Sequence, residues 1–381
     1  MSSSSSCAKP EFRIGESVSG FEVIKKIGSG GFGAVYKVQK DGIEFALKTE
    51  FIDDESDDTL KNEVHMLRLM QWSPSFCRLY TAKRLPWQNQ KVNIMVMTLC
   101  TRPVSRLRRM MPDRHFTKST AARLSLQLLE ALRDLHISGI IHRDVKASNC
   151  GWHAPTRRIL LFDLGFSRKY LEIDPITTKM RHRAARKDPG FMGTSKYCSV
   201  FAHDENEQGR RDDLWAWLYS TVEFFLGTLP WSDEEKSVRV SNMKKKVGRK
   251  LFFKCPREFA LMYEHIRQLK YDSSPDYQMM TNLFKQMFIR LDIEDSDPLD
   301  FEQGSIFYDE YFVSQTDSEK ELNSDLGTSD ELESHHNKRS EVVTIGSKTD
   351  SSETENKLGR LAAGFNRAIN RNRVEQFEND R

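Results

Sequence analysis

The stretch of residues 141–165 begins Ile-His-Arg-Asp144-Val-Lys146-Ala-Ser-Asn149 and ends Leu-Phe-Asp163-Leu-Gly. A carboxylate such as Asp144 can orient a hydroxyl and accept its proton, and a lysine such as Lys146 can neutralise a moving phosphoryl group. Asn149 and Asp163 offer oxygen ligands to Mg²⁺, which needs few protein ligands because it keeps several waters. The stretch therefore predicts phosphoryl transfer from a magnesium nucleotide. The alternative is an ordinary charged surface loop.

A glycine-rich turn, Gly28-Ser-Gly30-Gly-Phe-Gly33, separates two alternating apolar runs at residues 21–27 and 34–38. Because glycine has no Cβ, such a turn lets the backbone approach phosphates closely. The same glycine spacing also fits a dinucleotide-binding fold, which requires a helix directly after the glycines. Here β-branched and aromatic residues follow, so the pattern favours two strands joined in a hairpin.

A third strand is expected at residues 44–48, where Ala46 and Lys48 point to the same face. A helix is expected at residues 59–70, with Glu63 on or beside its apolar stripe. An unpaired carboxylate there would be costly, so Glu63 needs a cation, and Lys48 is the natural candidate. A solvated glutamate on the surface is the alternative.

Apolar periodicity predicts a strand at residues 91–99 and core helices at 117–140 and 211–226. The first of these helices leads into the stretch quoted above. The second begins beside Asp213, which is expected to brace that stretch from below.

Composition and charge limit the class of protein. Residues 301–381 contain ten Lys and Arg and seventeen Asp and Glu, so their net charge is −7, and the first 300 residues carry +10. A basic body with an acidic tail suits acidic partners. The sequence has neither aromatic residues interleaved with basic ones nor a known nucleic-acid-binding module. It therefore gives no indication of a nucleic-acid partner. There is no apolar run long enough to span a membrane and no signal-peptide order.

The six cysteines are scattered and form no C-x-x-C pair; they are Cys7, Cys77, Cys100, Cys150, Cys198 and Cys255. This pattern favours reduced thiols over disulfides or a zinc site. We therefore expect a cytoplasmic protein, with access to the nucleus left open, that has no integral membrane association and is monomeric.

The motifs of residues 20–300 together resemble those of a eukaryotic protein kinase of the casein kinase I group. The group blocks that this chain resembles are Thr194-Ser-Lys-Tyr-Cys-Ser-Val-Phe, Arg210-Arg-Asp-Asp-Leu-Trp, Thr228-Leu-Pro-Trp and Pro275-Asp-Tyr. Asp-Asp-Leu-Trp and Val222-Glu-Phe look most like the tau-tubulin kinase-like branch.

The resemblance implies an α+β, bilobal kinase fold. Residues 17–300 would form the kinase domain, with a small β-rich N-lobe of about 17–100 that carries one helix and a larger, mainly α-helical C-lobe of about 101–300. Residues 1–16 would be a disordered Ser-rich start. Residues 301–381 would be an acidic, largely disordered tail, with a short C-terminal helix as a further expectation.

The resemblance also assigns roles at the site. Asp144, Lys146 and Asn149 would be catalytic, and Asn149 and Asp163 would bind Mg²⁺. The residues expected to bind ATP are Ile27, Gly28, Gly30, Gly33, Val35, Ala46, Lys48, Glu63, Met97, Cys100 and Asp163. Within that set Met97 would lie at the back of the adenine pocket, and the backbone of residues 98–100 would form the hinge that binds adenine.

In the same family, residues 168–191 form the activation and substrate-binding segment. Its basic middle consists of Lys179, Arg181, Arg183, Arg186 and Lys187. These cations would favour protein substrates with acidic or phosphorylated segments.

Three positions depart from the family pattern. Leu164 replaces a Phe, Ala147 replaces a Pro, and Lys196 replaces an Arg. Leucine can fill the same apolar slot, so activity is expected to survive. The lysine lacks the bidentate fork of arginine, so an anion pocket there would be weaker. The alternatives to an active Ser/Thr kinase are a pseudokinase scaffold and a small-molecule phosphotransferase.

Overall fold

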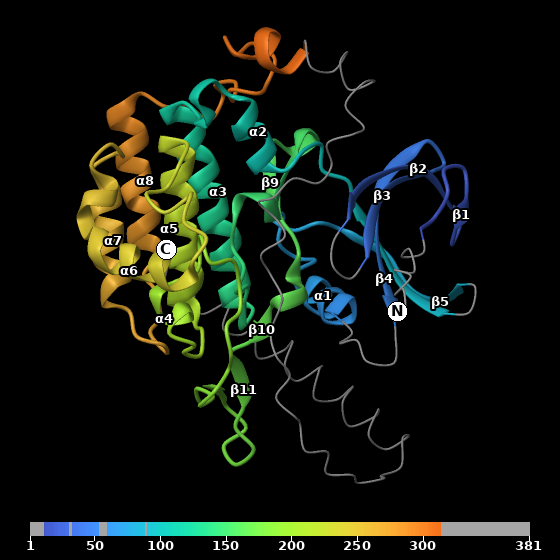
Figure 1. Ribbon diagram of the computed structural model, residues 1–381, viewed down its shortest axis with the longest axis horizontal. Coiled ribbons are helices and arrows are strands. Elements are labelled where there is room, and N and C mark those ends of the chain that lie inside the picture. The colour runs from blue at the N-terminus through green and yellow to red at the C-terminus, as the bar shows by residue number, and fades with distance from the viewer. Residues whose placement is uncertain (1–10, 30–32, 53–58, 88–89, 314–381) are drawn as a thin grey trace, which may run out of the picture.

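The computed structural model describes residues 11–29, 33–52, 59–87 and 90–313. Gly30, residues 1–10 and the tail beyond 313, with its expected short helix, lie outside the described residues. Figure 1 shows a β-sheet on one side of the molecule and a bundle of helices on the other. This arrangement confirms the expected α+β kinase fold.

The sheet is antiparallel and forms the N-terminal part of the described chain. Its strands, in spatial order, are β1 (Ser17–Val18), β2 (Phe21–Ser29), β3 (Ala34–Lys40), β4 (Ile43–Ile52), β6 (Gln90–Thr98) and β5 (Leu79–Trp87). The strands β2 and β3 pair directly, with Gly28 opposite Val35. A strand, β3, and not a helix therefore follows the glycines, so the dinucleotide-binding alternative is wrong.

The strand β5 was not expected from the sequence. It lies at the edge of the sheet and is mostly half-buried or exposed, so its residues LYTAKRLPW show no apolar alternation. It also contains Pro86, which an edge strand tolerates because one side of the strand makes no ladder hydrogen bonds. The pattern of such an edge strand is weak in any sequence.

The helices build the rest of the molecule. They are α1 (Thr59–Leu69), α2 (Val104–Met110), α3 (Lys118–Ile137), α4 (Val200–His203), α5 (Arg210–Leu226), α6 (Ser237–Val247), α7 (Glu258–Gln268) and α8 (Tyr277–Leu291). The short strands between them are β7 (Ile140–Ile141), β8 (Cys150–His153), β9 (Arg158–Leu161), β10 (Arg168–Lys169), β11 (Leu171–Ile173) and β12 (Met180–His182). No helix in the described residues is both long and apolar enough to cross a bilayer.

Helix α5 runs through the centre of the helical part. Its residues Trp217, Leu218, Val222 and Phe224 have no measurable exposure. Its start is fixed by Asp212, whose carboxylate accepts the Gly209 amide at 2.7 Å, and its end by Gly227 with φ +79°. A helix that is apolar nearly all round belongs in a core, as the sequence predicts.

Both ends of the expected domain need correction. Residues 11–16, expected to be part of a disordered start, include Phe12, which is buried and packs edge-on against Trp87. The packed chain also continues beyond 300, because Phe301 and Phe312 are buried in the core of the helical part. Composition alone hid these positions, since single aromatic residues within polar stretches do not change a local average.

Candidate active site

The centre of the site is Lys48, on strand β4. Its Nζ lies 2.7 Å from Glu63 Oε2 on α1 and 2.8 Å from Asp163 Oδ1, which follows β9. Lys48 and Asp163 are 115 residues apart in sequence. The expected Lys48–Glu63 pair is therefore confirmed, and the same ammonium also binds the carboxylate that the sequence assigns to metal.

Electrostatics keep Lys48 and Asp163 charged, whereas burial raises the pKa of Glu63. Burial lowers the pKa of Lys48, but attraction to Asp163 and Glu63 outweighs burial, so the net shift raises the pKa above its ordinary value. The Lys48 ammonium in turn lowers the pKa of the Asp163 carboxyl. Asp163 is therefore an anion at neutral pH, as a metal ligand must be.

Helix α1 holds the loop after Asp163 as well as Lys48. The Asn62 side chain donates from Nδ2 to the carbonyls of Gly165, at 2.8 Å, and Ser167, at 3.0 Å. Leu164 is buried at 1% exposure, so leucine does fill an apolar slot here. The carboxylate of Asp163 is thus placed by the sheet, by α1 and by the core.

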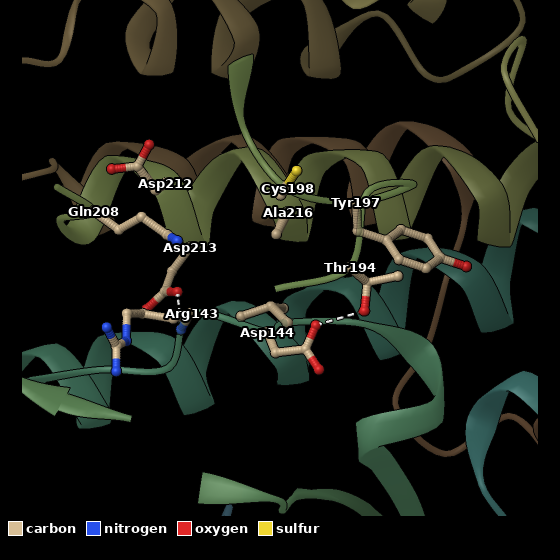
Figure 2. Close-up of a pocket in the computed structure, with 10 residues that line it drawn as sticks. Arg143, Asp144, Thr194, Tyr197, Cys198, Gln208, Asp212, Asp213 and Ala216 are labelled. Atoms are coloured by element: carbon tan, nitrogen blue, oxygen red, sulfur yellow. Dashed lines mark hydrogen bonds between the residues drawn. The ribbon is translucent and has the colours of Figure 1, made fainter. Parts of the chain in front are cut away.

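The loop before β8 brings Asp144 and Lys146 together. Lys146 Nζ lies 3.0 Å from Asp144 Oδ2. Both contact Thr194: its hydroxyl donates to Asp144 Oδ1 at 2.7 Å and accepts from Lys146 Nζ at 3.0 Å. Figure 2 shows Thr194 facing Asp144. The sequence did not single out Thr194 as a site residue, since its contacts depend on a fold that brings residues 48 to 50 positions apart into contact.

Two oxygen ligands are available for a cation. Asn149 donates from Nδ2 to the Asp144 carbonyl at 2.8 Å, which orients the amide, and no hydrogen bond to its Oδ1 is found among the described residues. No group of three or more His, Cys, Asp or Glu forms a metal site of its own within the described chain. Asn149 and Asp163 each offer an oxygen ligand, which suits a divalent cation that is also held by a nucleotide and water.

Asp213 braces the loop from α5, as expected. Its Oδ2 accepts the His142 amide at 2.7 Å and its Oδ1 accepts the Arg143 amide at 2.8 Å. The second of these bonds is drawn in Figure 2. His136 Nε2 lies 2.9 Å from the same carboxylate, so α3 also helps to hold the Asp213 side chain in place.

The residues expected around adenine lie on adjacent strands, except Cys100, which follows β6. Val35 pairs with Lys48, and Ala46 pairs with Met97. Met97 and Ala46 are buried, Val35 and Cys100 are half-buried, and Ile27 is exposed. Gly28 and Gly33 flank the turn, at the end of β2 and just before β3.

The basic activation segment is largely neutralised within the chain. Arg181 pairs with Glu172 and Asp174, Arg183 lies 3.6 Å from Glu172, and Arg186 donates to Glu207. Only Lys179 and Lys187, of the five expected cations, have no ion pair among the described residues. These pairings were not predicted because they depend on the fold: the β11–β12 hairpin brings Glu172 and Asp174 to their arginines, and Glu207 reaches Arg186 from the segment between α4 and α5.

Arg108 is a buried cation in a basic stretch of the sequence, residues 102–114. It lies on α2 and is 7% exposed. Its guanidinium donates to the carbonyls of Arg114 and Gly227, both at 2.6 Å, and lies 3.2 Å from Glu223. A cation can lie in the core when a buried carboxylate and backbone carbonyls are its partners.

Comparison with known proteins agrees with this geometry. The protein kinase domain family matches residues 21–291, so the chain belongs to the protein kinase family. It is 32% identical over 298 residues to a probable serine/threonine-protein kinase of Dictyostelium discoideum, covering 76% of this chain and 58% of that protein. It is 32% identical over 292 residues to a Caenorhabditis elegans protein named as a serine/threonine-protein kinase, covering 74% and 82%.

The fold has a solved counterpart in vaccinia related kinase 3. That structure superposes with a TM-score of 0.65 at 17% identity, covering 77% of this chain and 96% of the other. At that identity the likeness concerns the fold alone. The kinase domain implies use of ATP with a divalent metal, and the relatives' names agree with transfer to Ser and Thr.

Proposed function

We propose that this protein transfers the γ-phosphoryl group of MgATP to Ser and Thr hydroxyls of protein substrates. The observation that carries the proposal is the meeting of Lys48 with Asp163 at 2.8 Å and with Glu63 at 2.7 Å. A cation for the phosphates and an anion for the metal are held side by side. Such preorganised electrostatics are the main catalytic resource in phosphoryl transfer.

Each group then has a role. Lys48 holds the α- and β-phosphates, and Asp163 with Asn149 holds Mg²⁺, which neutralises charge on the phosphates when bound. Asp144 orients the acceptor hydroxyl and takes its proton. Lys146 stabilises the γ-phosphoryl group. The Thr194 hydroxyl holds the side chains of Asp144 and Lys146 in position through its hydrogen bonds to both.

The glycine-rich residues 28–33 would cover the nucleotide, which would lie against β2, β3, β4 and β6. Val35, Ala46 and Met97 would contact adenine, and the backbone of residues 98–100 would bind its edge. Gly28, Gly30 and Gly33 let the turn approach the phosphates. Ile27 and Cys100 border the same space.

We assign the chain to the casein kinase I group and, within it, to the tau-tubulin kinase-like branch. The group blocks quoted from the sequence support this assignment, and two of them make contacts around the site. Trp231 Nε1 donates to the Lys196 carbonyl at 2.8 Å, and the Tyr277 hydroxyl bonds His136, which contacts Asp213.

The substrates are acidic or prephosphorylated protein segments. Lys179 and Lys187 in the activation segment and the +10 charge of residues 1–300 support this preference. Two peptides that differ only in having Glu or Lys upstream of one serine test it. The Glu peptide is expected to show kcat/KM at least about tenfold higher, and equal values would contradict the preference. The cytoplasmic location stays a prediction.

Asp144→Asn tests the catalytic assignment. Asparagine keeps the size of the side chain but cannot take the proton, so turnover should fall by ~10²-fold or more. Nucleotide binding, measured by a fluorescent ATP analogue, should persist because Asp144 does not hold the phosphates. A radiolabelled-phosphate assay on an acidic peptide supplies the rates.

The same assay separates the rival candidate, a pseudokinase scaffold. Transfer by the wild-type chain that Asp144→Asn abolishes supports an enzyme. Nucleotide binding by a wild-type chain without transfer to any peptide would favour the scaffold.

A further inference from the structure

Lys244, on α6, is a lysine buried at 5% exposure. Its Nζ donates to the carbonyls of Ser195, at 2.6 Å, and Cys198, at 2.7 Å. It also lies 5.0 Å from the centre of the Tyr219 ring. No carboxylate forms an ion pair with it among the described residues. Burying an ammonium without a counter-ion is costly, so the carbonyl and ring contacts must compensate for the lost water.

The carbonyls that Lys244 binds belong to residues 194–198, which we call the acceptor loop. This loop starts at Thr194, the residue whose hydroxyl contacts Asp144 and Lys146. Figure 2 shows Thr194, Tyr197 and Cys198 lining one pocket together with Asp144 and Ala216, which belongs to α5. The amides of Tyr197 and Cys198 both donate to the Thr194 carbonyl at 2.9 Å, so the loop is a tight turn. A shift of its carbonyls would therefore move Thr194.

A second buried charge holds the other side of the acceptor loop. Glu223, on α5, is 1% exposed; its Oε2 accepts the Tyr197 hydroxyl at 2.8 Å, and its Oε1 lies 2.8 Å from Lys196 Nζ. Glu223 thus fixes side chains of the loop, while Lys244 fixes its backbone. Lys196, the cation that an anion pocket would use, is already paired with a carboxylate of the chain.

We propose that Lys244 is a positioning residue for the phosphoryl acceptor. Its ammonium holds the acceptor loop in the shape that sets Thr194 against Asp144 and Lys146 and that receives the protein substrate. This role rests on the proposed kinase function and adds a residue to it that touches neither nucleotide nor metal. Charge on Lys244 should therefore affect use of the peptide and leave use of ATP nearly unchanged.

Titration offers a way to remove that charge without mutation. Burial lowers the pKa of Lys244 to about 8. The titratable groups that face it are His203 from α4, Cys198 from the loop and Tyr219 from α5. Burial lowers the pKa of His203 to about 4, raises that of Cys198 to about 11 and raises that of Tyr219. Between pH 6 and 9, Lys244 is thus the member of this cluster that loses its charge.

The test compares Lys244→Met, Lys244→Arg and the control Lys245→Met. Lys245 is the next residue on the same helix, is exposed and pairs with Asp204 at 2.9 Å. Steady-state kinetics use MgATP and an acidic serine peptide. Lys244→Met should lower kcat/KM for the peptide by about 10- to 100-fold, the scale of a small misplacement at a reacting centre. KM for ATP should change less than about twofold, and Lys245→Met should match wild type.

The pH profile is the readout that a purely structural lysine would not move. For wild type, kcat/KM for the peptide should fall as pH rises through about 8, because the ammonium is lost there. The fall should be absent in Lys244→Met. A wild-type profile that stays flat through this range, or an identical fall in the Met variant, would overturn the proposal.

Hydrogen exchange gives a readout that needs no catalysis. The Tyr197 and Cys198 amides should exchange at least about tenfold faster in Lys244→Met than in Lys245→Met, since their turn loses its anchor. Unchanged exchange would refute the role even if the variant were slow. Lys244→Arg keeps the charge and should recover part of the protection. This variant keeps the test valid if Lys244→Met folds poorly. A wild-type chain that phosphorylates no peptide would instead count against the proposed function.

Discussion

At the scale of single residues, the site is built from opposite charges that satisfy one another. Lys48 forms ion pairs with two carboxylates, and Asp144 and Lys146 both form a hydrogen bond with the Thr194 hydroxyl. Each of these groups would be costly to bury alone. Their geometry is therefore fixed by mutual attraction, and removing one partner should displace the others.

Glu63→Gln tests this coupling. Glutamine keeps the shape but removes the charge that orients Lys48, so kcat/KM should fall by about 10- to 100-fold while the fold persists. Thermal unfolding and steady-state kinetics measure the two effects. The matched control is Glu44→Gln, which removes an exposed carboxylate paired with Lys37 on the same sheet. Similar rates for the two variants would show that Lys48 does not need Glu63.

The sequence predicts some contacts of the site and not others. Lys48, Glu63, Asp144 and Asp163 could be found because each sits in a short pattern of typed residues. Arg108, Lys196 and Lys244 could not, because their partners lie on other elements: Glu223 on α5 for the first two, and loop carbonyls for Lys244. Local composition shows that a residue is charged but does not show whether that charge is already balanced.

At the scale of elements, the β2–β3 hairpin depends on a close approach of two backbones. A Cβ built on Gly33 would lie 1.7 Å from the Thr49 carbonyl oxygen of β4, whereas one on Gly28 would make an ordinary contact of 3.7 Å with Val35. The two glycines of the turn therefore differ in their steric need. The sequence pattern treats them alike.

Gly33→Ala should destabilise the protein by about 1 to 3 kcal/mol, because β3 must move away from β4. Gly28→Ala, on the same hairpin, serves as the control and should change the free energy of unfolding by much less. Urea unfolding measures both. Equal losses would mean that the hairpin can shift freely at Gly33.

Elements with strong periodicity were predicted well. The helix expected at 117–140 is α3 (Lys118–Ile137), and the helix expected at 59–70 is α1 (Thr59–Leu69). Their apolar stripes face one core, so the period survives in the sequence. The edge strand β5 and the hairpin of β11 and β12 were missed, because elements with few buried residues leave little periodicity to read.

At the scale of the whole molecule, a residue near the end of the described chain contacts the start of α3. Asp300, 4% exposed, accepts the Thr117 amide and hydroxyl, both at 2.7 Å, and the Thr120 hydroxyl at 2.9 Å. Thr117 is the N-cap of α3. One carboxylate near the end of the described chain thus completes the start of a central helix.

Asp300→Ala should cost about 3 kcal/mol of unfolding free energy, because a charged acceptor is lost and buried donors stay unpaired. The control is Asp309→Ala, an exposed carboxylate slightly further along the chain. Urea denaturation of the two full-length variants gives the difference. A loss within about 0.5 kcal/mol for Asp300→Ala would show that water replaces the carboxylate.

The contacts between Asp300 and the start of α3 can form only late in synthesis. Thr117 and Asp300 are 183 residues apart, so a ribosome working at ordinary speed needs about 10 to 40 s to make the second after the first. Over that interval the nascent chain holds α3 with its N-cap Thr117 but without the Asp300 carboxylate that accepts from Thr117 and Thr120. A chaperone that shields apolar surface would be most useful to this protein in that window, before the last part of the domain leaves the exit tunnel.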